Sequence, residues 1–467
     1  MKKQNIKTLV LLSFIGLSLF AVLFTACKKE CDKNDPNSEC YVPPVVVKGY
    51  ADIVGEIKKN RTLSADTVYL LKGFVYVENG ATLTIPAGTL IKGDKDSKAT
   101  LIIERGGKIM AQGTKDKPIV FTSNQPKGQR NYGDCGGIII CGNARVNVPG
   151  GEARIEGGPR SFFGGTNDND NSGVMTYCRI EFCGVEYQVD NEINGLTMGG
   201  VGRGTKIEYI QVSYCGDDSY EWFGGNVDGK YLVAFRGWDD EFDTDNGYSG
   251  RLQFLVAIRD KNVADKSLSN GFESDNDSQG SNNSPYTSPV FSNVSIFGPI
   301  DLAHQPTGGN GDFHAAMHLR RNTKLKVHNS VFAGFPFGLF IENGGRGDAQ
   351  GNAQNGELIV KNCIMAGMGQ NFKEDAHASA LSPTFNQDYY NRAGGNNRLF
   401  TTVNDLRISS LTLNSPNFLP QSGSPLLSGA NFDGLDGFFE RVNFIGAFGT
   451  TDWTAGWCNW DPQNTDY

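Results

Sequence analysis

The sequence feature that most constrains the fold is a repeat of 22 residues between Tyr209 and Gly247. Each copy contains an apolar-rich segment, an Asp-Asp pair and a short segment of aromatic and acidic residues. The corresponding positions are Tyr209 and Tyr231, Asp217 and Asp239, Asp218 and Asp240, Tyr220 and Phe242, and Glu221 and Asp243. A period of this length, built from strands and turns, is typical of a solenoid and predicts a parallel β-helix.

Two further pairs of segments support the same architecture. Residues 82–91 align with residues 100–109 at an offset of 18, and residues 325–334 align with residues 358–367 at an offset of 33. The second alignment places Asn329 and Asn362 at equivalent turns, where we expect stacked asparagines to hydrogen-bond along the solenoid axis.

The domain organisation follows from these repeats. The body shows no helical periodicity of useful length, and 59 glycines among 467 residues suit a turn at every rung. We expect an all-β, single-stranded parallel β-helix over residues 49–414, followed by the last rungs and a C-terminal cap over residues 415–467. Trp453 and Trp457 are expected to cover the last rung, because an open rung is an aggregation edge. Glycine- and asparagine-rich loops are expected at residues 159–172, 261–270, 280–288 and 306–312.

Residues 1–26 form an expected export signal, with Lys2, Lys3 and Lys7 before an apolar stretch. A transmembrane helix would look similar, but the polar run after Cys27 favours cleavage. Residues 24–27 (Phe-Thr-Ala-Cys) resemble a bacterial lipobox, which implies that Cys27 is lipidated. Residues 27–48 are then a flexible tether, polar and afterwards proline-rich.

The net charge of the chain limits the classes of partner that it can bind. The formal net charge is −8, and loss of the three signal lysines would lower it to about −11. Such a chain is a poor ligand for nucleic acid or an anionic membrane surface. The predicted membrane partner is therefore outer-membrane lipid, held through Cys27, with the protein on the periplasmic or exposed face.

The cysteines leave several pairings open. Cys31 and Cys40 flank a short polar loop and could pair in an oxidising compartment. Cys183 and Cys215 occupy matching positions in successive repeats, and we expect stacked free thiols there in preference to a disulfide. Cys135 and Cys141 lie on one strand and cannot bridge each other.

Four segments, together with the doubled Asp-Asp pattern, resemble a group of exported right-handed parallel β-helix proteins of Bacteroidetes and other Gram-negative bacteria. They are residues 80–88, 194–202, 205–213 and 446–457. The resemblance implies the right-handed, pectate-lyase-like fold, which pectate lyases, polygalacturonases and phage tailspikes share. Fold alone does not deliver function.

An acidic ladder is the best candidate for chemistry. Glu221, Asp243 and Glu273 fall at corresponding places in three consecutive rungs, and Asp245 and Asp275 lie two residues further along, on the same face. Carboxylates stacked about 4.8 Å apart repel one another unless a cation or a shared proton intervenes.

Three interpretations of this ladder remain open. In the first, Ca²⁺ binds among the acids, because it takes six to eight oxygen ligands. The candidate ligands are Asp217, Asp218, Asp239, Asp240, Asp243, Asp245 and Asp275. In the second, a pair of acids acts as acid and base on a polysaccharide. The candidate catalytic residues are Glu221, Asp243, Asp245 and Glu273. In the third, the acids line a solvated face.

The sequence lacks the motifs that accompany the catalytic acids in enzymes of this fold. The Gly-His-Gly and Arg-Ile-Lys motifs of polygalacturonases are absent. Pectate lyases need an arginine base, and no pattern singles one out among Arg236, Arg259, Arg320 and Arg321.

Two smaller constellations could bind metals. Asp168 and Asp170 open a segment that resembles the start of an EF-hand loop, but Arg179 stands where a bidentate glutamate is required. His314 and His318 would share one face of a strand or helix and could bind a transition metal with Asp312; a packed histidine pair is the alternative.

Together these features predict a lipid-anchored binding or adhesion protein for glycans or other extracellular polymers. A polysaccharide lyase or glycoside hydrolase is the alternative.

Replacing the predicted lipidation site tests the anchor. Cys27→Ala should move the protein from the membrane fraction to the soluble fraction, because the acyl chains supply the membrane affinity. Fractionation with immunoblotting measures this, and Cys31→Ala is the matched control. A Cys27→Ala protein that stays with the membrane would contradict lipidation.

Overall fold

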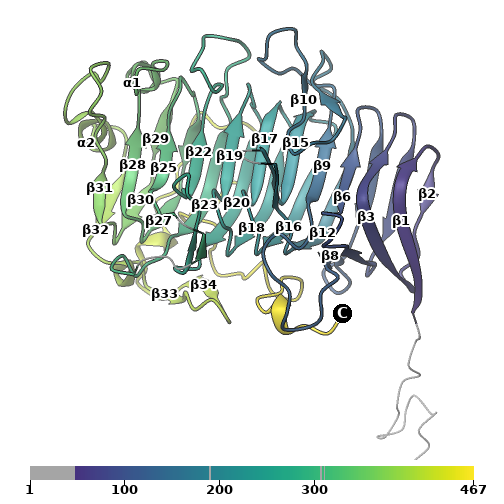
Figure 1. Cartoon of the computed structure of the whole chain (residues 1–467). Coiled ribbons are helices and arrows are strands. Elements are labelled where there is room, and N and C mark those ends of the chain that lie inside the picture. The colour runs from purple at the N-terminus through teal and green to yellow at the C-terminus, as the bar shows by residue number, and fades with distance from the viewer. Residues whose placement is uncertain (1–47, 189–190, 305–307, 310) are drawn as a thin grey trace, which may run out of the picture. The chain divides into compact units, whose positions relative to one another are not determined.

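Parallel strand pairing joins each turn of the chain to the next, so that residues 49–400 wind into a right-handed parallel β-helix (Figure 1). The structure, a computed structural model, describes residues 48–467 except 189–190, 305–307 and 310. The predicted signal peptide, Cys27, Cys31, Cys40 and the tether lie outside the described residues. Within the described ranges, no helix is long and apolar enough to cross a membrane.

Three ladders of strands form the faces of the coil. Face 1 contains β2 (Arg61–Thr62), β4 (Thr82–Pro86), β7 (Lys108–Gln112), β26 (Lys326–His328) and β29 (Ile359–Lys361). Face 2 contains β5 (Leu90–Gly93), β8 (Ile119–Ser123), β27 (Val331–Ala333), β30 (Ile364–Ala366) and β32 (Arg398–Phe400). Face 3 contains β6 (Thr100–Ile103), β9 (Gly137–Cys141), β15 (Leu196–Val201), β17 (Tyr220–Gly225), β19 (Phe242–Asp245), β22 (Phe272–Ser274), β25 (Ala315–Leu319), β28 (Phe337–Ile341) and β31 (Gln370–Phe372).

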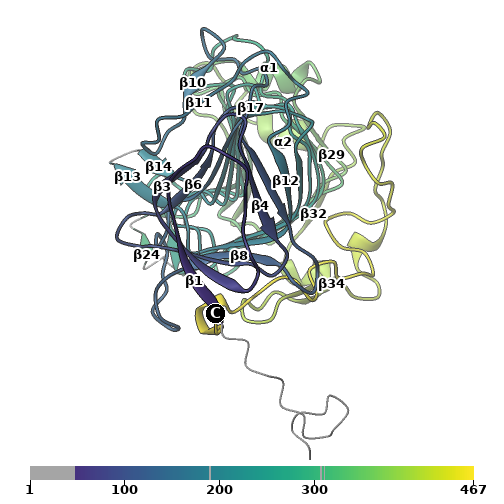
Figure 2. The ribbon, with the colours of Figure 1, turned by 90° about the vertical axis from the view of Figure 1, so that its right-hand side faces the viewer.

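Longer strands bend across two faces. Faces 1 and 2 share β12 (Gly173–Glu181), β16 (Lys206–Ser213), β18 (Gly229–Phe235), β20 (Arg251–Ile258) and β23 (Val290–Phe297). Faces 2 and 3 share β1 (Gly49–Ile57) and β3 (Thr67–Val77). Figure 2 shows the coil from its end, with the strands around a common interior. Every second side chain points into this interior, and one core cluster extends from Ile53 to Tyr390.

The register agrees with two of the three repeats seen in the sequence. Glu221 pairs with Asp243 and Ile210 with Leu232, which is the 22-residue period; Val331 pairs with Ile364, which is the 33-residue period. The offset of 18 is wrong. Thr82 pairs with Lys108, while Thr100 belongs to face 3. The alignment arose because strands on two different faces of the coil have similar sequences.

The corner between faces 1 and 2 carries one ladder of side chains. Its residues adopt the left-handed conformation, with φ between 50° and 61°. They are Tyr177, Tyr209, Tyr231, Phe254, Asn293, Asn329 and Asn362. Stacking offsets the strain of this conformation: the rings of Tyr209 lie 4.3 Å and 4.4 Å from those of Tyr177 and Tyr231. Asn362 Nδ2 donates to Asn329 Oδ1 at 3.3 Å, which confirms the predicted asparagine stack.

The expectation that the C-terminal tryptophans cap the last rung is wrong. After the hairpin of β33 (Ile408–Ser410) and β34 (Asn417–Pro420), the chain runs back outside the coil toward earlier rungs (Figure 1). Trp457 packs edge-on against Tyr177 and Tyr209, because their stacked rings offer a large apolar surface at the corner. Farther along, Tyr467 Oη hydrogen-bonds the Glu181 carboxylate at 2.6 Å. This segment also contains the short 3₁₀ helices η1 (Val403–Leu406), η2 (Pro425–Leu427) and η3 (Pro462–Asn464).

A short helix, α2 (Phe385–Tyr390), closes the end of the core instead. Tyr389 and Tyr390 are buried in the core cluster, and the Tyr390 hydroxyl donates to the carbonyls of Cys363 and Arg398 at 3.1 Å. The helix α2 therefore covers the apolar interior at the last strands.

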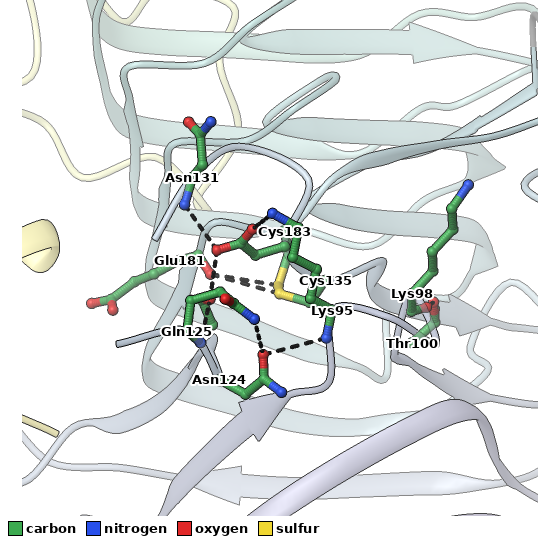
Figure 3. Close-up of a disulfide and its surroundings, with 11 residues drawn as sticks. Lys95, Lys98, Thr100, Asn124, Gln125, Asn131, Cys135, Glu181 and Cys183 are labelled. Carbon is green, nitrogen blue, oxygen red and sulfur yellow. Dashed lines mark hydrogen bonds and ion pairs between the residues drawn. A yellow bond between two sulfur atoms is a disulfide. The ribbon is translucent and has the colours of Figure 1, made fainter. Parts of the chain in front are cut away.

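A disulfide between Cys135 and Cys183 joins neighbouring rungs (Figure 3). Cys183 is therefore not free, and the expectation of a free Cys183 thiol is wrong, while Cys215 is a buried free thiol. The sequence repeats did not predict this pairing, because the insertion between β9 and β12 separates the two cysteines by 48 residues.

The long connections gather at the two edges of face 3. They include the hairpin of β10 (Ala153–Arg154) and β11 (Phe162–Phe163), the hairpin of β13 (Val185–Gln188) and β14 (Asn191–Ile193), the pair β21 (Val263–Ala264) and β24 (Gly308–Gly309), and α1 (Ala349–Gln354). Each connection enters or leaves a strand of face 3, so loops flank the outward side of this face.

Removing the Trp457 ring tests the role of the C-terminal segment. Trp457 is 1% exposed, so Trp457→Ala should lower the free energy of unfolding by about 3–5 kcal/mol. Chemical denaturation followed by circular dichroism measures the change. Tyr50→Ala, at a position 84% exposed, should change it little. Equal stability of the two variants would contradict the packing role.

Candidate functional site: the outward side of face 3

Alternation along the strands of face 3 places polar side chains outside the coil. In β17, Tyr220 and Trp222 point into the core, while Glu221 points outward. The same alternation and pairing produce a row along the axis that consists of Thr197, Glu221, Asp243, Glu273, His318 and Phe340. This row confirms the predicted register of Glu221, Asp243 and Glu273.

The Asp-Asp pairs lie in the turns that lead into these strands. Asp218 Oδ1 accepts a hydrogen bond from the backbone N–H of Asp240 at 2.8 Å, and Asp240 Oδ1 accepts one from the N–H of Asn270. Each side chain thus satisfies a backbone donor of the next rung. Part of the acidic repeat is therefore structural.

The remaining carboxylate oxygens converge in two overlapping groups. Oxygens of Asp217, Asp218 and Asp239 lie within 4.8 Å of one another, and so do oxygens of Asp218, Glu221 and Asp243. The Oδ1 atoms of Asp239 and Asp243 are inaccessible to solvent and make no hydrogen bond within the described ranges. Buried oxygens of this kind require a partner, because leaving them unpaired costs about 1–3 kcal/mol each.

Burial and mutual repulsion raise the pKa values of these acids. Burial first, and the Glu156 and Asp243 carboxylates next, raise the pKa of Glu221 well above its ordinary range. Burial, followed by the charges of Glu273 and Asp240, does the same for Asp243. Burial raises the pKa of Asp239 to about 7. The acids of this group therefore favour either protons or a bound cation.

One rung further, at Glu273, the pKa is lowered instead of raised. Burial would raise the pKa of Glu273, but the Arg320 charge and the His318 side chain outweigh it and lower the pKa to about 2. Arg320 contacts Glu273 and donates to Asp275 at 3.0 Å, and Arg321 donates to Asp275 at 2.6 Å. Asp243 and Glu273, direct cross-strand neighbours, thus have pKa values shifted in opposite directions.

The other predicted ligands form hydrogen bonds or ion pairs with neighbouring side chains. Asp245 accepts hydrogen bonds from the backbone and side chain of Asn246, and Asp275 is held by the two arginines. Asp168 forms an ion pair with Arg145, while Asp170 accepts from Asn143 at 3.0 Å. In the part of the chain that the structure describes, Asp168 and Asp170 do not join other acids in a group that could hold a metal ion.

The sequence did not indicate Glu156 or Asn194 as contributors to this site, and it left Arg320 without a role. Glu156 comes from the insertion that contains β10, and its pKa is raised to about 7 by burial and the charge of Glu192. Asn194 donates to Glu221 from the turn before β15. Arg320 reaches the ladder from β25, and its position directly after the outward-facing His318 strand was the available signal.

His314 lies directly before β25 and His318 lies within it, and their rings are 4.9 Å apart. His314 Nδ1 lies 3.0 Å from Asn270 Oδ1, and its Nε2 lies 2.6 Å from Lys373 Nζ. His318 Nε2 lies 2.8 Å from Glu342 Oε2. These are packed, partnered histidines, as the alternative interpretation expected.

The arginines that the sequence left unassigned fall into two sets. Arg236 pairs with Asp260, and Arg259 forms a fully buried pair with Glu241 at 3.1 Å. Among the four, Arg320 and Arg321 form ion pairs with the acids of the outward row and its neighbours, while Arg259 donates to the backbone carbonyl of Asp239.

The comparisons with known proteins bear on the fold. A family model described as pectate-lyase-like β-helix domain matches residues 55–406. No curated protein and no solved structure matches the chain.

The raised pKa values predict a pH-dependent stability. Asp239 and Glu156 have ordinary pKa values of 3.8 and 4.5 and folded values of about 7. Between these values the folded chain holds more protons than the unfolded chain, so stability should fall as the pH rises from about 4 to about 7. Melting temperatures in a chelator across this range measure the effect.

Asp243→Asn should flatten this pH profile and raise the melting temperature at about pH 8, because it removes one repelling charge. Asp116→Asn is the control, since Asp116 is exposed. A melting temperature of the unsubstituted chain that stays constant over this pH range would contradict the assignment.

Proposed function

The chain belongs to the family of pectate-lyase-like β-helix domains, and from this we propose that it is a cell-envelope protein that binds glycans or other extracellular polymers with the help of Ca²⁺. The binding surface is the outward side of face 3, between the flanking loops. The ion lies among Asp217, Asp218, Asp239, Glu221 and Asp243.

The observation that carries this proposal is the convergence of buried and half-buried carboxylates that form no ion pair with an arginine or lysine among the described residues. Five carboxylates that lie this close together cannot all ionise unless positive charge is supplied. The arginines nearest in sequence, Arg236 and Arg259, pair with Asp260 and Glu241 instead. Ca²⁺ fits the oxygen-only donor set, since it prefers carboxylates and carbonyls to nitrogen or sulfur ligands.

Two features support placement in the cell envelope. The disulfide between Cys135 and Cys183 suits an oxidising compartment. The lipobox-like residues 24–27 would attach the chain to the outer membrane through Cys27.

A second candidate function, polysaccharide cleavage, is favoured by one observation. Asp243 and Glu273 are neighbours on adjacent rungs, about 4.8 Å apart along the axis, and their pKa values are shifted apart. A retaining glycosidase uses a protonated and an ionised carboxyl about 5 Å apart, a separation that side chains on adjacent rungs can reach. In this mechanism Asp243 donates a proton to the leaving oxygen and Glu273 attacks the sugar.

Calorimetric titration of the metal-free chain tests the cation. We expect one tight Ca²⁺ site, and Asp243→Asn should weaken it at least tenfold, because it removes a charged ligand. Asp116→Asn should leave it unchanged. The same samples are then titrated with polysaccharides, with and without Ca²⁺. Absence of Ca²⁺ binding would contradict the cation, and absence of binding to every polymer would contradict the glycan partner.

Product analysis of the same mixtures separates binding from catalysis. Saturable binding without chain cleavage is the expected result. Release of shorter sugars that is abolished by Glu273→Gln would instead establish the second candidate.

A further inference from the structure

A lysine lies one rung beyond Phe340, the last residue of the outward row of face 3. Lys373 directly follows β31, and its backbone N–H donates to the carbonyl of Leu339 at 3.1 Å. Its Nζ atom lies 4.8 Å from the centre of the Phe340 ring and 5.2 Å from that of Phe337. The side chain is half-buried, and it forms no ion pair among the described residues. Its amine is therefore reachable from solvent without being held by a carboxylate.

The amine donates to a histidine whose orientation is fixed. Lys373 Nζ lies 2.6 Å from His314 Nε2, and His314 Nδ1 lies 3.0 Å from Asn270 Oδ1. The Asn270 amide is oriented in turn, because its Nδ2 donates to the Leu268 carbonyl at 3.0 Å and its Oδ1 accepts from the N–H of Ala315 at 3.1 Å. An amide oxygen only accepts, so Nδ1 of His314 carries the hydrogen and Nε2 turns its lone pair to the amine.

The surroundings favour the uncharged forms of both groups. Burial first, and the charges of His318 and Lys373 next, lower the pKa of His314 to about 3, so its ring is neutral at pH 7. Burial also lowers the pKa of Lys373, and the Glu342 carboxylate opposes this shift only in part. The amine therefore loses its proton at a lower pH than that of an exposed lysine, and the neutral amine is the nucleophilic form.

We propose that Lys373 is a nucleophile that captures aldehydes, with His314 as its base and Asn270 as the residue that positions the base. A nucleophile, a base within hydrogen-bond distance and a third group that orients the base are the parts of an activated nucleophile. Aldehydes are the fitting class, because an amine needs no leaving group to react with them. Small hydroxyaldehydes, including the open-chain form of a reducing sugar, suit a half-buried amine beside two aromatic rings. This activity goes beyond the proposed glycan binding and does not depend on Ca²⁺.

The reaction is an addition followed by loss of water. The Lys373 nitrogen forms a bond to the aldehyde carbon, His314 Nε2 accepts a proton from that nitrogen, and the aldehyde oxygen takes a proton from water. His314 then returns its proton to the new hydroxyl group, the C–O bond breaks and water leaves. The nitrogen releases its remaining proton to water. Amine and aldehyde thus become imine and water, with no oxidant or reductant.

Reductive labelling of the full chain with glycolaldehyde tests the inference. Sodium cyanoborohydride converts each imine to a stable secondary amine, and peptide mass spectrometry gives the labelling rate of each lysine at pH 7. Lys373 should be labelled at least about tenfold faster than Lys59, because a positioned base contributes about 10²–10⁴-fold. Accessibility alone predicts the reverse order, since Lys59 is exposed and Lys373 is half-buried. His314→Phe keeps a ring but removes the proton acceptor, so it should abolish most of the excess, whereas His377→Phe, at an exposed histidine, should preserve it.

Two results would overturn the inference. Labelling of Lys373 no faster than that of Lys59 would exclude an activated amine, and this comparison uses the unsubstituted chain. An unchanged Lys373 rate in a folded His314→Phe chain would exclude His314 as the base. Melting curves and the Lys59 rate of the same sample show whether each variant is folded. If His314→Phe does not fold, the comparison of Lys373 with Lys59 in the unsubstituted chain decides.

Discussion

Stacking of one rung on the next at about 4.8 Å is the constraint on which the structure depends. Parallel pairing places equivalent residues of successive rungs directly above one another, so any repeated residue type becomes a row along the axis. Rows of apolar residues make the core. Rows of tyrosine and asparagine stabilise the left-handed corners. A row of carboxylates, by contrast, concentrates negative charge and raises the energy of the folded chain.

The molecule accommodates the carboxylate row in two ways. At β22, arginines from the following rung neutralise Glu273 and Asp275. Among the residues that the structure describes, the acids of β17 and β19 form no ion pair with an arginine, and their pKa values rise because of burial and repulsion. Protons satisfy these acids only while the pH stays below their raised pKa values, whereas the proposed divalent cation would satisfy them at higher pH. The loops at the edges of face 3 raise these pKa values further, because they help to bury the carboxylates that repel one another.

The sequence is sufficient to predict the fold and the register of the carboxylates, since the 22-residue repeat aligns Glu221 with Asp243 without ambiguity. It is insufficient where insertions interrupt the repeat. Arg320 and Cys183 reach their partners Glu273 and Cys135 across 47 and 48 residues, and no periodicity connects such positions. The C-terminal segment was also mispredicted: aromatic residues near a chain end suggested a cap, but the tyrosine ladder at the corner offers them a larger apolar surface.

The central claim is that a cation balances the carboxylates of β17, β19 and the turns before them. Its most direct test is a crystal structure of the full chain grown with Ca²⁺, examined for anomalous scattering. The account predicts a peak about 2.3–2.6 Å from carboxylate oxygens of Asp218, Glu221 and Asp243. Ordered water with no anomalous peak among these oxygens, at saturating Ca²⁺ and neutral pH, would contradict it.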